Sequence, residues 1–116
     1  MTSKKANKKP RGKHTAEQSE QAMIEGILEG SPDALGVAVI RYNCGCRKMA
    51  AVDKTGEAAS KIIMYRDLAI SICDLCKEDN GAYTRITAYF MHWVTPEPKA
   101  DTKTMIETKV FGSRSH

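Results

Sequence analysis

The chain has 116 residues, a net charge of +4 and only seven aromatic side chains. A chain of this length forms one domain with tails, and so small a domain has difficulty building a self-sufficient hydrophobic core. No apolar run approaches membrane-spanning length, and no apolar stretch follows the basic residues at the N-terminus. We therefore expect no transmembrane helix and no secretory signal, which favours a reducing cytoplasm where paired cysteines bind metal.

The positive charge is concentrated in residues 1–14, which contain six basic side chains and no acidic one. The basic residues are Lys4, Lys5, Lys8, Lys9, Arg11 and Lys13. The other 102 residues carry 12 basic and 14 acidic side chains, a balance of −2. The segment lacks apolar periodicity, so we expect a disordered basic tail. Its charge makes it the predicted contact surface for nucleic acid, although such a tail can also serve solubility alone.

An amphipathic helix is expected over residues 15–30. Thr15 and Gln18 have the spacing of a capping box, and residues 30–32 (GSP) end the run. Five apolar residues form a narrow stripe on this helix: Ala16, Met23, Ile24, Ile27 and Leu28. The stripe either packs on the rest of the domain or docks a protein partner through residues 16–29.

Short β-rich segments characterise the middle of the chain, from residue 34 to 94. Residues 37–42 (VAVIRY) and 47–52 are expected to be strands separated by the first cysteine pair. We expect a further strand over 68–72, directly before the second cysteine pair. The pattern over 58–66 fits a helix or a strand, and both interpretations stay open.

The segment 82–93 decides between two folds. The β-branched and aromatic content of residues 83–94 indicates a strand, whereas apolar residues spaced along 82–93 also trace one face of a helix. Residues 95–98 (TPEP) form a break at the start of an expected linker over 95–116. Within that linker, residues 104–111 (TMIETKVF) are compatible with a late strand, followed by a loose C-terminus.

The four cysteines of the chain form two close pairs, which 26 residues separate. Cys44 and Cys46 flank Gly45, and Cys73 and Cys76 have two residues between them. Zinc takes four ligands at tetrahedral corners, and a close pair supplies two adjacent corners. The one-residue spacing of the first pair requires unusual backbone angles, which glycine accepts at low steric cost. The pattern predicts a four-cysteine site that binds one Zn²⁺ per chain.

Redox chemistry and iron–sulfur clusters are alternative uses of the thiols. Close cysteine pairs can act as redox groups, but such pairs generally lie at the start of a helix in a βαβ setting, which is not expected around Cys73. Iron–sulfur clusters also use four thiolates, although the one-residue spacing is less typical of their common patterns. Unligated core cysteines would not account for two close pairs without a solitary cysteine.

The cysteine pattern of residues 36–94 resembles that of zinc-ribbon and zinc-knuckle proteins. The resemblance implies a small α+β fold of zinc-ribbon-like β-hairpins, in which Cys44, Cys46, Cys73 and Cys76 ligate one zinc and backbone amides donate to the sulfurs. A treble clef is the alternative if residues 82–93 are helical. Three basic residues directly follow the pairs and either offset the negative charge of the site or are ordinary solvated side chains: Arg47, Lys48 and Lys77.

No enzyme is predicted, because four thiolates would fill the zinc coordination that a catalytic site keeps partly open. The histidines His14, His92 and His116 do not form a ligand cluster in the sequence, and no phosphate-binding loop, nucleophile elbow or HExxH motif is present. No small-molecule substrate is evident either.

We therefore predict a non-enzymatic structural-zinc module that binds nucleic acid or a nucleic-acid-associated complex through its basic tail. Four aromatic residues either form the core or stack on bases of single strands: Tyr83, Tyr89, Phe90 and Trp93. The alternatives are a protein-interaction adaptor of unknown partner and a thiol redox or metal-responsive switch.

Overall fold

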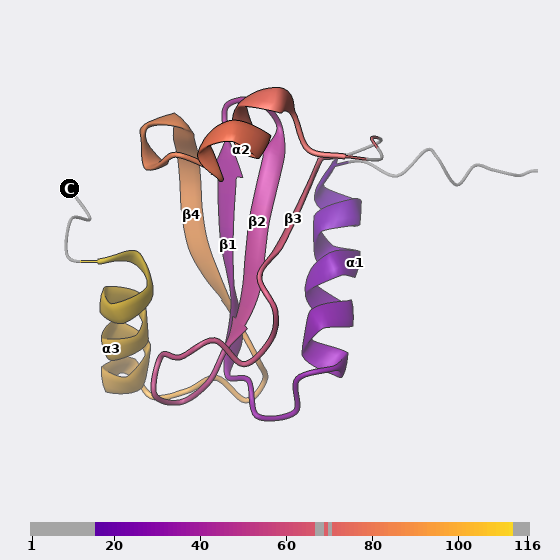
Figure 1. Cartoon of the computed structure of the whole chain (residues 1–116). Helices are drawn as coiled ribbons and strands as arrows, with labels where there is room; N and C mark the ends of the chain where they lie inside the picture. The colour runs from indigo at the N-terminus through magenta and orange to yellow at the C-terminus, as the bar shows by residue number, and fades with distance from the viewer. Residues whose placement is uncertain (1–15, 67–68, 70, 113–116) are drawn as a thin grey trace, which may run out of the picture.

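The computed structural model describes residues 16–66, 69 and 71–112, and an antiparallel sheet of four strands in the order β3-β2-β1-β4 forms its centre. The strands are β1 (Gly36–Tyr42), β2 (Cys46–Val52), β3 (Ile63–Arg66) and β4 (Ile86–Trp93). The helices of this part are α1 (Ala16–Glu29), α2 (Asp74–Asp79), the short 3₁₀ helix η2 (Tyr83–Arg85) and α3 (Ala100–Phe111). Figure 1 shows α1 and α3 on opposite sides of the sheet and α2 at one end of it.

Strand β1 lies in the interior of the sheet, and both of its faces are covered. It pairs with β2 through a tight hairpin and with β4, which comes much later in the chain. Val37 and Val39 belong to the core beneath α1, whereas Ala38 belongs to the core beneath α3. A strand buried on both faces has an almost continuous apolar sequence instead of an alternating one, and the start of β1 (GVAVI) has this composition.

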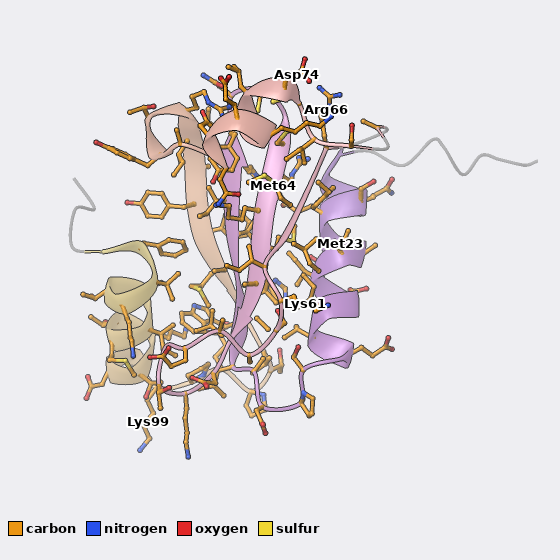
Figure 2. All side chains as sticks on the ribbon, in the orientation of Figure 1. Met23, Lys61, Met64, Arg66, Asp74 and Lys99 are labelled. Carbon is orange, nitrogen blue, oxygen red and sulfur yellow. The ribbon has the colours of Figure 1, made fainter. Side chains whose placement is uncertain are left out.

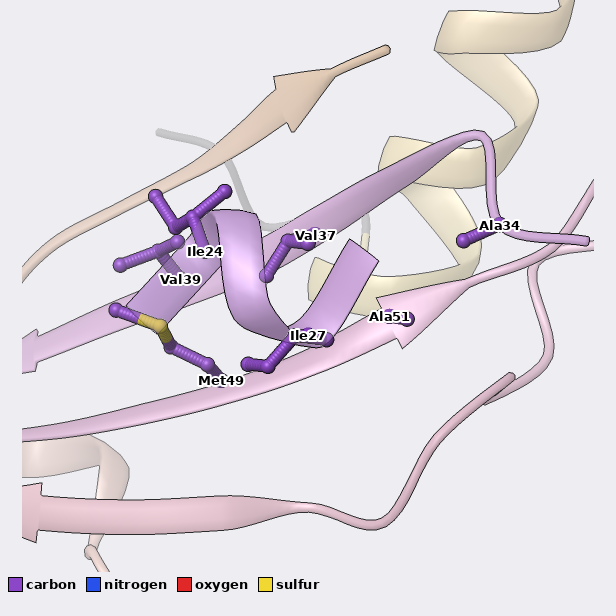
Figure 3. Packing of buried hydrophobic residues seen from close by; sticks show 7 residues of the cluster. All are labelled: Ile24, Ile27, Ala34, Val37, Val39, Met49 and Ala51. Carbon is purple, nitrogen blue, oxygen red and sulfur yellow. The ribbon is translucent and has the colours of Figure 1, made fainter. Parts of the chain in front are cut away.

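Helix α1 packs its apolar stripe on the sheet. Ile24 and Ile27 are buried against Val37, Val39 and Met49, as Figure 3 shows at close range. Burying a side chain of this size stabilises the fold by roughly 1.5–3 kcal/mol. Ile24 and Ile27 therefore agree with the first of the two expectations for the apolar stripe, that it packs on the rest of the domain. Among the described residues, no helix is both long and apolar enough to cross a membrane.

The expectation of a late strand over residues 104–111 is wrong, because these residues belong to helix α3. Ile106 is fully buried and Val110, one helical turn later, packs in the same cluster against the sheet. Asp101 in the first turn and Lys109 in the last turn suit the helix dipole. The β-branched residues that suggested a strand are outweighed by this packing and by these end effects.

The third strand also lies elsewhere than expected. The expected range 68–72 falls partly outside the described residues, and its described positions 69, 71 and 72 are not in a strand. Strand β3 ends at Arg66 because its partner there is Cys46, the first residue of β2. Residues 86–93 form strand β4 and are preceded only by the short 3₁₀ helix η2, so the structure has no α-helix over 82–93 and is not the treble clef that such a helix would give.

Candidate metal centre

The first cysteine pair lies at the tip of the β1–β2 hairpin. The backbone N–H of Gly45 donates to the carbonyl of Tyr42 at 3.0 Å and closes the turn. Gly45 has a φ of +91°, a conformation that side chains with a Cβ rarely adopt. The turn places Cys44 before the bend and Cys46 at the start of β2, so both thiols face the space beneath α2.

The second pair lies at the start of helix α2, which was not expected. Cys73 is the residue before the first helical turn, with extended backbone angles, and Cys76 lies within that turn. The helix ends at Asn80, whose left-handed conformation directs its N–H to the carbonyl of Cys76 at 2.8 Å. The two faces of the site are thus a hairpin tip and a short helix, in place of the two hairpins that the zinc-ribbon resemblance implied.

The four cysteine sulfurs gather in one cluster. All four Sγ atoms lie within 4.8 Å of one another, and the Sγ atoms of Cys44 and Cys76 are 3.6 Å apart. Ligands at a tetrahedral zinc with Zn–S bonds of about 2.3 Å would be separated by about 3.8 Å. All four cysteines are free thiols. The donor set and its spacing therefore fit a single tetrahedral metal ion.

Hydrogen bonds to the sulfurs surround this cluster. The backbone N–H of Cys73 donates to Sγ of Cys46 at 3.4 Å. The guanidinium of Arg85 donates from Nη1 to Sγ of Cys44 at 3.2 Å and from Nη2 to Sγ of Cys76 at 3.3 Å. Arg85 thus contacts one sulfur from each pair. Partners of this kind fix the orientation of metal ligands and tune the charge of the site.

Asp79 holds Arg85 in this position. Its carboxylate accepts from Nη2 of Arg85 at 2.7 Å and from Nε at 3.2 Å. This bidentate contact matches the planar geometry of the guanidinium group. The hydrogen bond with Arg85 lowers the pKa of Asp79, and the same bond raises the pKa of Arg85, so both remain charged at neutral pH. The ring of Tyr42 lies beneath the guanidinium, 5.7 Å from its carbon atom.

The thiols of the cluster differ in acidity. Burial raises the pKa of Cys46 to about 12, and burial also raises the pKa of Cys76. Burial acts on Cys44 in the same direction, but hydrogen bonds from the backbone of Cys46 and from the neighbouring thiols outweigh it, and the pKa falls to about 6. Cys44 therefore ionises before Cys46 and Cys76, and a metal ion has to displace protons from these two thiols.

The basic residues that directly follow the cysteines have other contacts. Arg47 pairs with Glu20 of α1, with Nε 2.8 Å from Oε2. Nζ of Lys48 donates to the carbonyl of Asn80 at 2.9 Å, which joins β2 to the end of α2. Lys77 is exposed. The side chain that reaches the sulfurs is Arg85, which lies nine positions after Cys76 and has no spacing motif to reveal it.

Other residues singled out in the sequence lie away from the cluster. His92 pairs with Val37 near the end of the sheet opposite the cysteines, so it is not a ligand of this site. The six predicted nucleic-acid contacts lie outside the described residues: Lys4, Lys5, Lys8, Lys9, Arg11 and Lys13. Tyr83 and Tyr89 are exposed, whereas Phe90 and Trp93 are half-buried in the core clusters.

Comparison of the chain with protein-family models, with curated proteins and with solved structures found no match. The resemblance to zinc-binding proteins therefore remains at the level of the cysteine motif.

Proposed function

We propose that the chain is a small non-enzymatic module built around a structural Zn²⁺ ion, and that it binds nucleic acid or a nucleic-acid-associated complex. The observation that supports a metal ion is the close approach of the four cysteine sulfurs, which lie within 4.8 Å of one another. Four thiolates complete a tetrahedral zinc coordination, so no position remains for a substrate or a reactive water. The ion would stabilise the fold, with about 10–16 kcal/mol of apparent binding free energy in comparable peptides.

The close approach of the sulfurs favours one ion over an iron–sulfur cluster. The inorganic core of such a cluster separates its cysteines, whereas Sγ of Cys44 and Sγ of Cys76 are 3.6 Å apart. Thiolates of this number also select zinc among the common divalent ions. A redox pair is the competing use of the same residues, and it predicts disulfides in place of bound metal.

Metal analysis of the purified protein tests the first part of this proposal. We expect one zinc per chain, and a chelator that removes it should lower the free energy of unfolding. The variant Cys46→Ser should bind zinc more weakly, whereas Ser60→Ala, a change beside Ala51 near the other end of β2, should bind it normally. Disulfide formation under mild oxidant in protein that never binds metal would support the redox alternative and contradict zinc.

The nucleic-acid part of the proposal rests on charge. Residues 1–14 carry six positive charges without an acidic residue. Helix α1 begins at Ala16, at the same end of the sheet as α2 (Figure 1), and the basic segment precedes it in the sequence. Positive side chains that neutralise phosphates release counterions, and the resulting affinity does not depend on base sequence.

A charge-neutral variant tests this part. Replacing the six basic residues of 1–14 by glutamine keeps the length of the segment while removing its charge. We expect the affinity for a fluorescent oligonucleotide to fall steeply and its dependence on salt to become weaker. Equal binding by the two proteins would show that the basic segment does not contact nucleic acid. A protein-docking role for residues 16–29 gains no support, because Ile24 and Ile27 are buried against the sheet.

A further inference from the structure

Four of the seven aromatic residues of the chain line one groove of about 400 Å³: Tyr42, Tyr83, Tyr89 and Phe111. This aromatic groove lies on the sheet face that carries α3, between the segment after α2 and the end of α3. Its floor is a row of cross-strand neighbours, with Lys48 of β2 beside Ile40 of β1 and Ile40 beside Tyr89 of β4. One wall carries Tyr83 and the opposite wall carries Phe111.

Two of the four aromatic rings in the groove are exposed to solvent. Tyr83 is 71% exposed and Tyr89 is 40% exposed. Tyr89 is paired with Phe111, with ring centroids 4.7 Å apart, so one ring supports the other from the side of α3. A chain with only seven aromatic residues would gain stability by burying them, yet the side chains of these two tyrosines remain exposed.

The charge of the groove favours an anionic ligand. Lys48 is the charged residue among the described residues that line it. Glu107 lines a neighbouring pocket, which shares Tyr89 and Phe111 with the groove. The carboxylate of Asp79 accepts from the backbone N–H of the groove residue Gly81, but its charge is paired with Arg85. The groove therefore offers exposed π-faces together with one ammonium group. A base and its phosphate have the complementary chemistry.

We propose that the aromatic groove binds single-stranded nucleic acid, with Tyr83 and Tyr89 stacking on bases and Lys48 contacting a phosphate. The proposal rests on the nucleic-acid binding proposed above and assigns part of it to the folded domain. Stacking requires unpaired bases, because the faces of the bases are covered by their neighbours in a duplex. Single strands should therefore bind more tightly than duplexes of the same length.

The metal centre would hold one wall of this groove in place. Tyr83 follows shortly after α2, and Lys48 is bonded to the carbonyl of Asn80 at the end of that helix. Gly81 lies so close to Tyr42 that an added Cβ would come within 2.5 Å of its hydroxyl oxygen. Tyr42 itself packs with Cys46 and Cys76. Loss of the metal should therefore weaken binding of single strands as well as the fold.

Titration of the full chain with a short fluorescent oligothymidine tests the proposal. We expect Tyr83→Ala to weaken binding about 5- to 100-fold, as removal of a base-stacking ring does, whereas Tyr83→Phe keeps the affinity. Lys48→Gln should lower the slope of log affinity against log salt by about 0.7, the value for one phosphate of a single strand. Circular dichroism of each variant confirms that it is folded.

Matched controls lie outside the groove. Ile62→Ala removes a hydrophobic side chain that is 65% exposed, and Lys61→Gln removes one exposed positive charge (Lys61 is labelled in Figure 2). Both should bind as the unaltered chain does. If the charge-neutral tail variant loses binding while Tyr83→Ala and Lys48→Gln behave like these controls, the groove proposal fails and the tail proposal stands. Absence of any binding to oligothymidine by the full chain overturns both.

Discussion

Arg41 and Arg47 lie directly opposite each other on strands β1 and β2. Two like charges in this position destabilise a sheet unless a third group compensates for them. Glu20 of α1 is that group: Oε1 accepts from Nη2 of Arg41 at 2.7 Å, and Oε2 accepts from Nε of both arginines at 2.8–2.9 Å. The side chain of Glu20 is nearly buried, so α1 is fastened to the hairpin that carries the first cysteine pair.

Glu20→Gln should therefore destabilise the protein at neutral pH by about 2–3 kcal/mol, because two half-buried guanidinium groups lose their ion pairs with the buried Glu20 carboxylate. The hydrogen bond with Arg41 is the largest influence on the pKa of Glu20 and lowers it from its usual value. A lowered pKa in the folded state contributes stability above the unfolded pKa of about 4.3, and this contribution is lost as the pH falls through the folded value.

Urea denaturation of both proteins at several pH values checks this prediction. The difference in free energy of unfolding between the unaltered chain and Glu20→Gln should be largest near pH 7 and shrink in acid below about pH 4. Glu29→Gln, an exposed change on the same helix, should stay within about 0.5 kcal/mol. A difference that is constant with pH would mean that the carboxylate charge of Glu20 does not stabilise the fold.

Arg85→Ala should weaken zinc binding about 10- to 100-fold, the usual effect of removing a partner that orients metal ligands. Two sulfur hydrogen bonds, to Cys44 and Cys76, disappear in this variant. Competition with a chromophoric chelator measures the affinity. Arg85→Lys should recover it only in part, because a single ammonium cannot bridge two sulfurs and the carboxylate of Asp79 as the planar guanidinium does.

Alkylation of the zinc-loaded protein gives a second measurement of the role of Arg85. Hydrogen bonds stabilise thiolates and reduce their nucleophilicity, so Cys44 and Cys76 should react faster with iodoacetamide in Arg85→Ala. Lys77→Ala removes an exposed cation near the same cysteines and should change neither quantity. Equal reaction rates in the Arg85 and Lys77 variants would argue against this role.

Removal of the metal should loosen the cysteine end of the molecule more than the core beneath α1. Tyr42, Cys46 and Cys76 form their own buried cluster, which the ion would hold together. The cluster beneath α1 has Ile24 and Met49 at its centre and does not include a cysteine. Hydrogen exchange after chelation should therefore accelerate most over residues 71–86. Uniform acceleration over the sheet would mean that the two clusters unfold as one unit.

Ile106→Ala should cost about 2–5 kcal/mol, because this side chain is fully buried between α3 and the sheet. The neighbouring Met105 is 42% exposed, and Met105→Ala should cost less than about 1 kcal/mol. Thermal or urea unfolding of the two variants makes the comparison. Similar losses for both would mean that α3 does not pack on the sheet through Ile106.

The sequence predicted the cluster of four cysteines better than the residues that surround it. Spacing alone brings Cys44 to Cys46 and Cys73 to Cys76, because a short chelate loop has few conformations. Whether the pairs meet depends on long-range pairing of β1 with β4, which leaves no local signal. Arg85 was missed for the same reason, since its contact with Cys44 joins residues 41 positions apart.

Residues 104–111 show where local preference misleads. Thr104, Thr108 and Val110 favour a strand on their own, but the apolar residues Ile106 and Val110 also have helical spacing. As a helix, these residues pack Ile106 and Val110 against the sheet, and this tertiary packing outweighs the local preference for a strand. For residues 82–93 the sequence left a strand and a helix open, and the structure has strand β4 over 86–93, in agreement with the β-branched and aromatic content of this run.

The candidate metal would also act on the denatured chain, because 26 residues separate Cys46 from Cys73. An ion that remained bound to both pairs in the denatured chain would cross-link it and tie this segment into a ring, as a disulfide does. By the chain-entropy estimate, a ring of this size disfavours the denatured ensemble by about 3–4 kcal/mol. Shortening the segment would reduce that entropic effect, even in a variant that keeps every sulfur where it is.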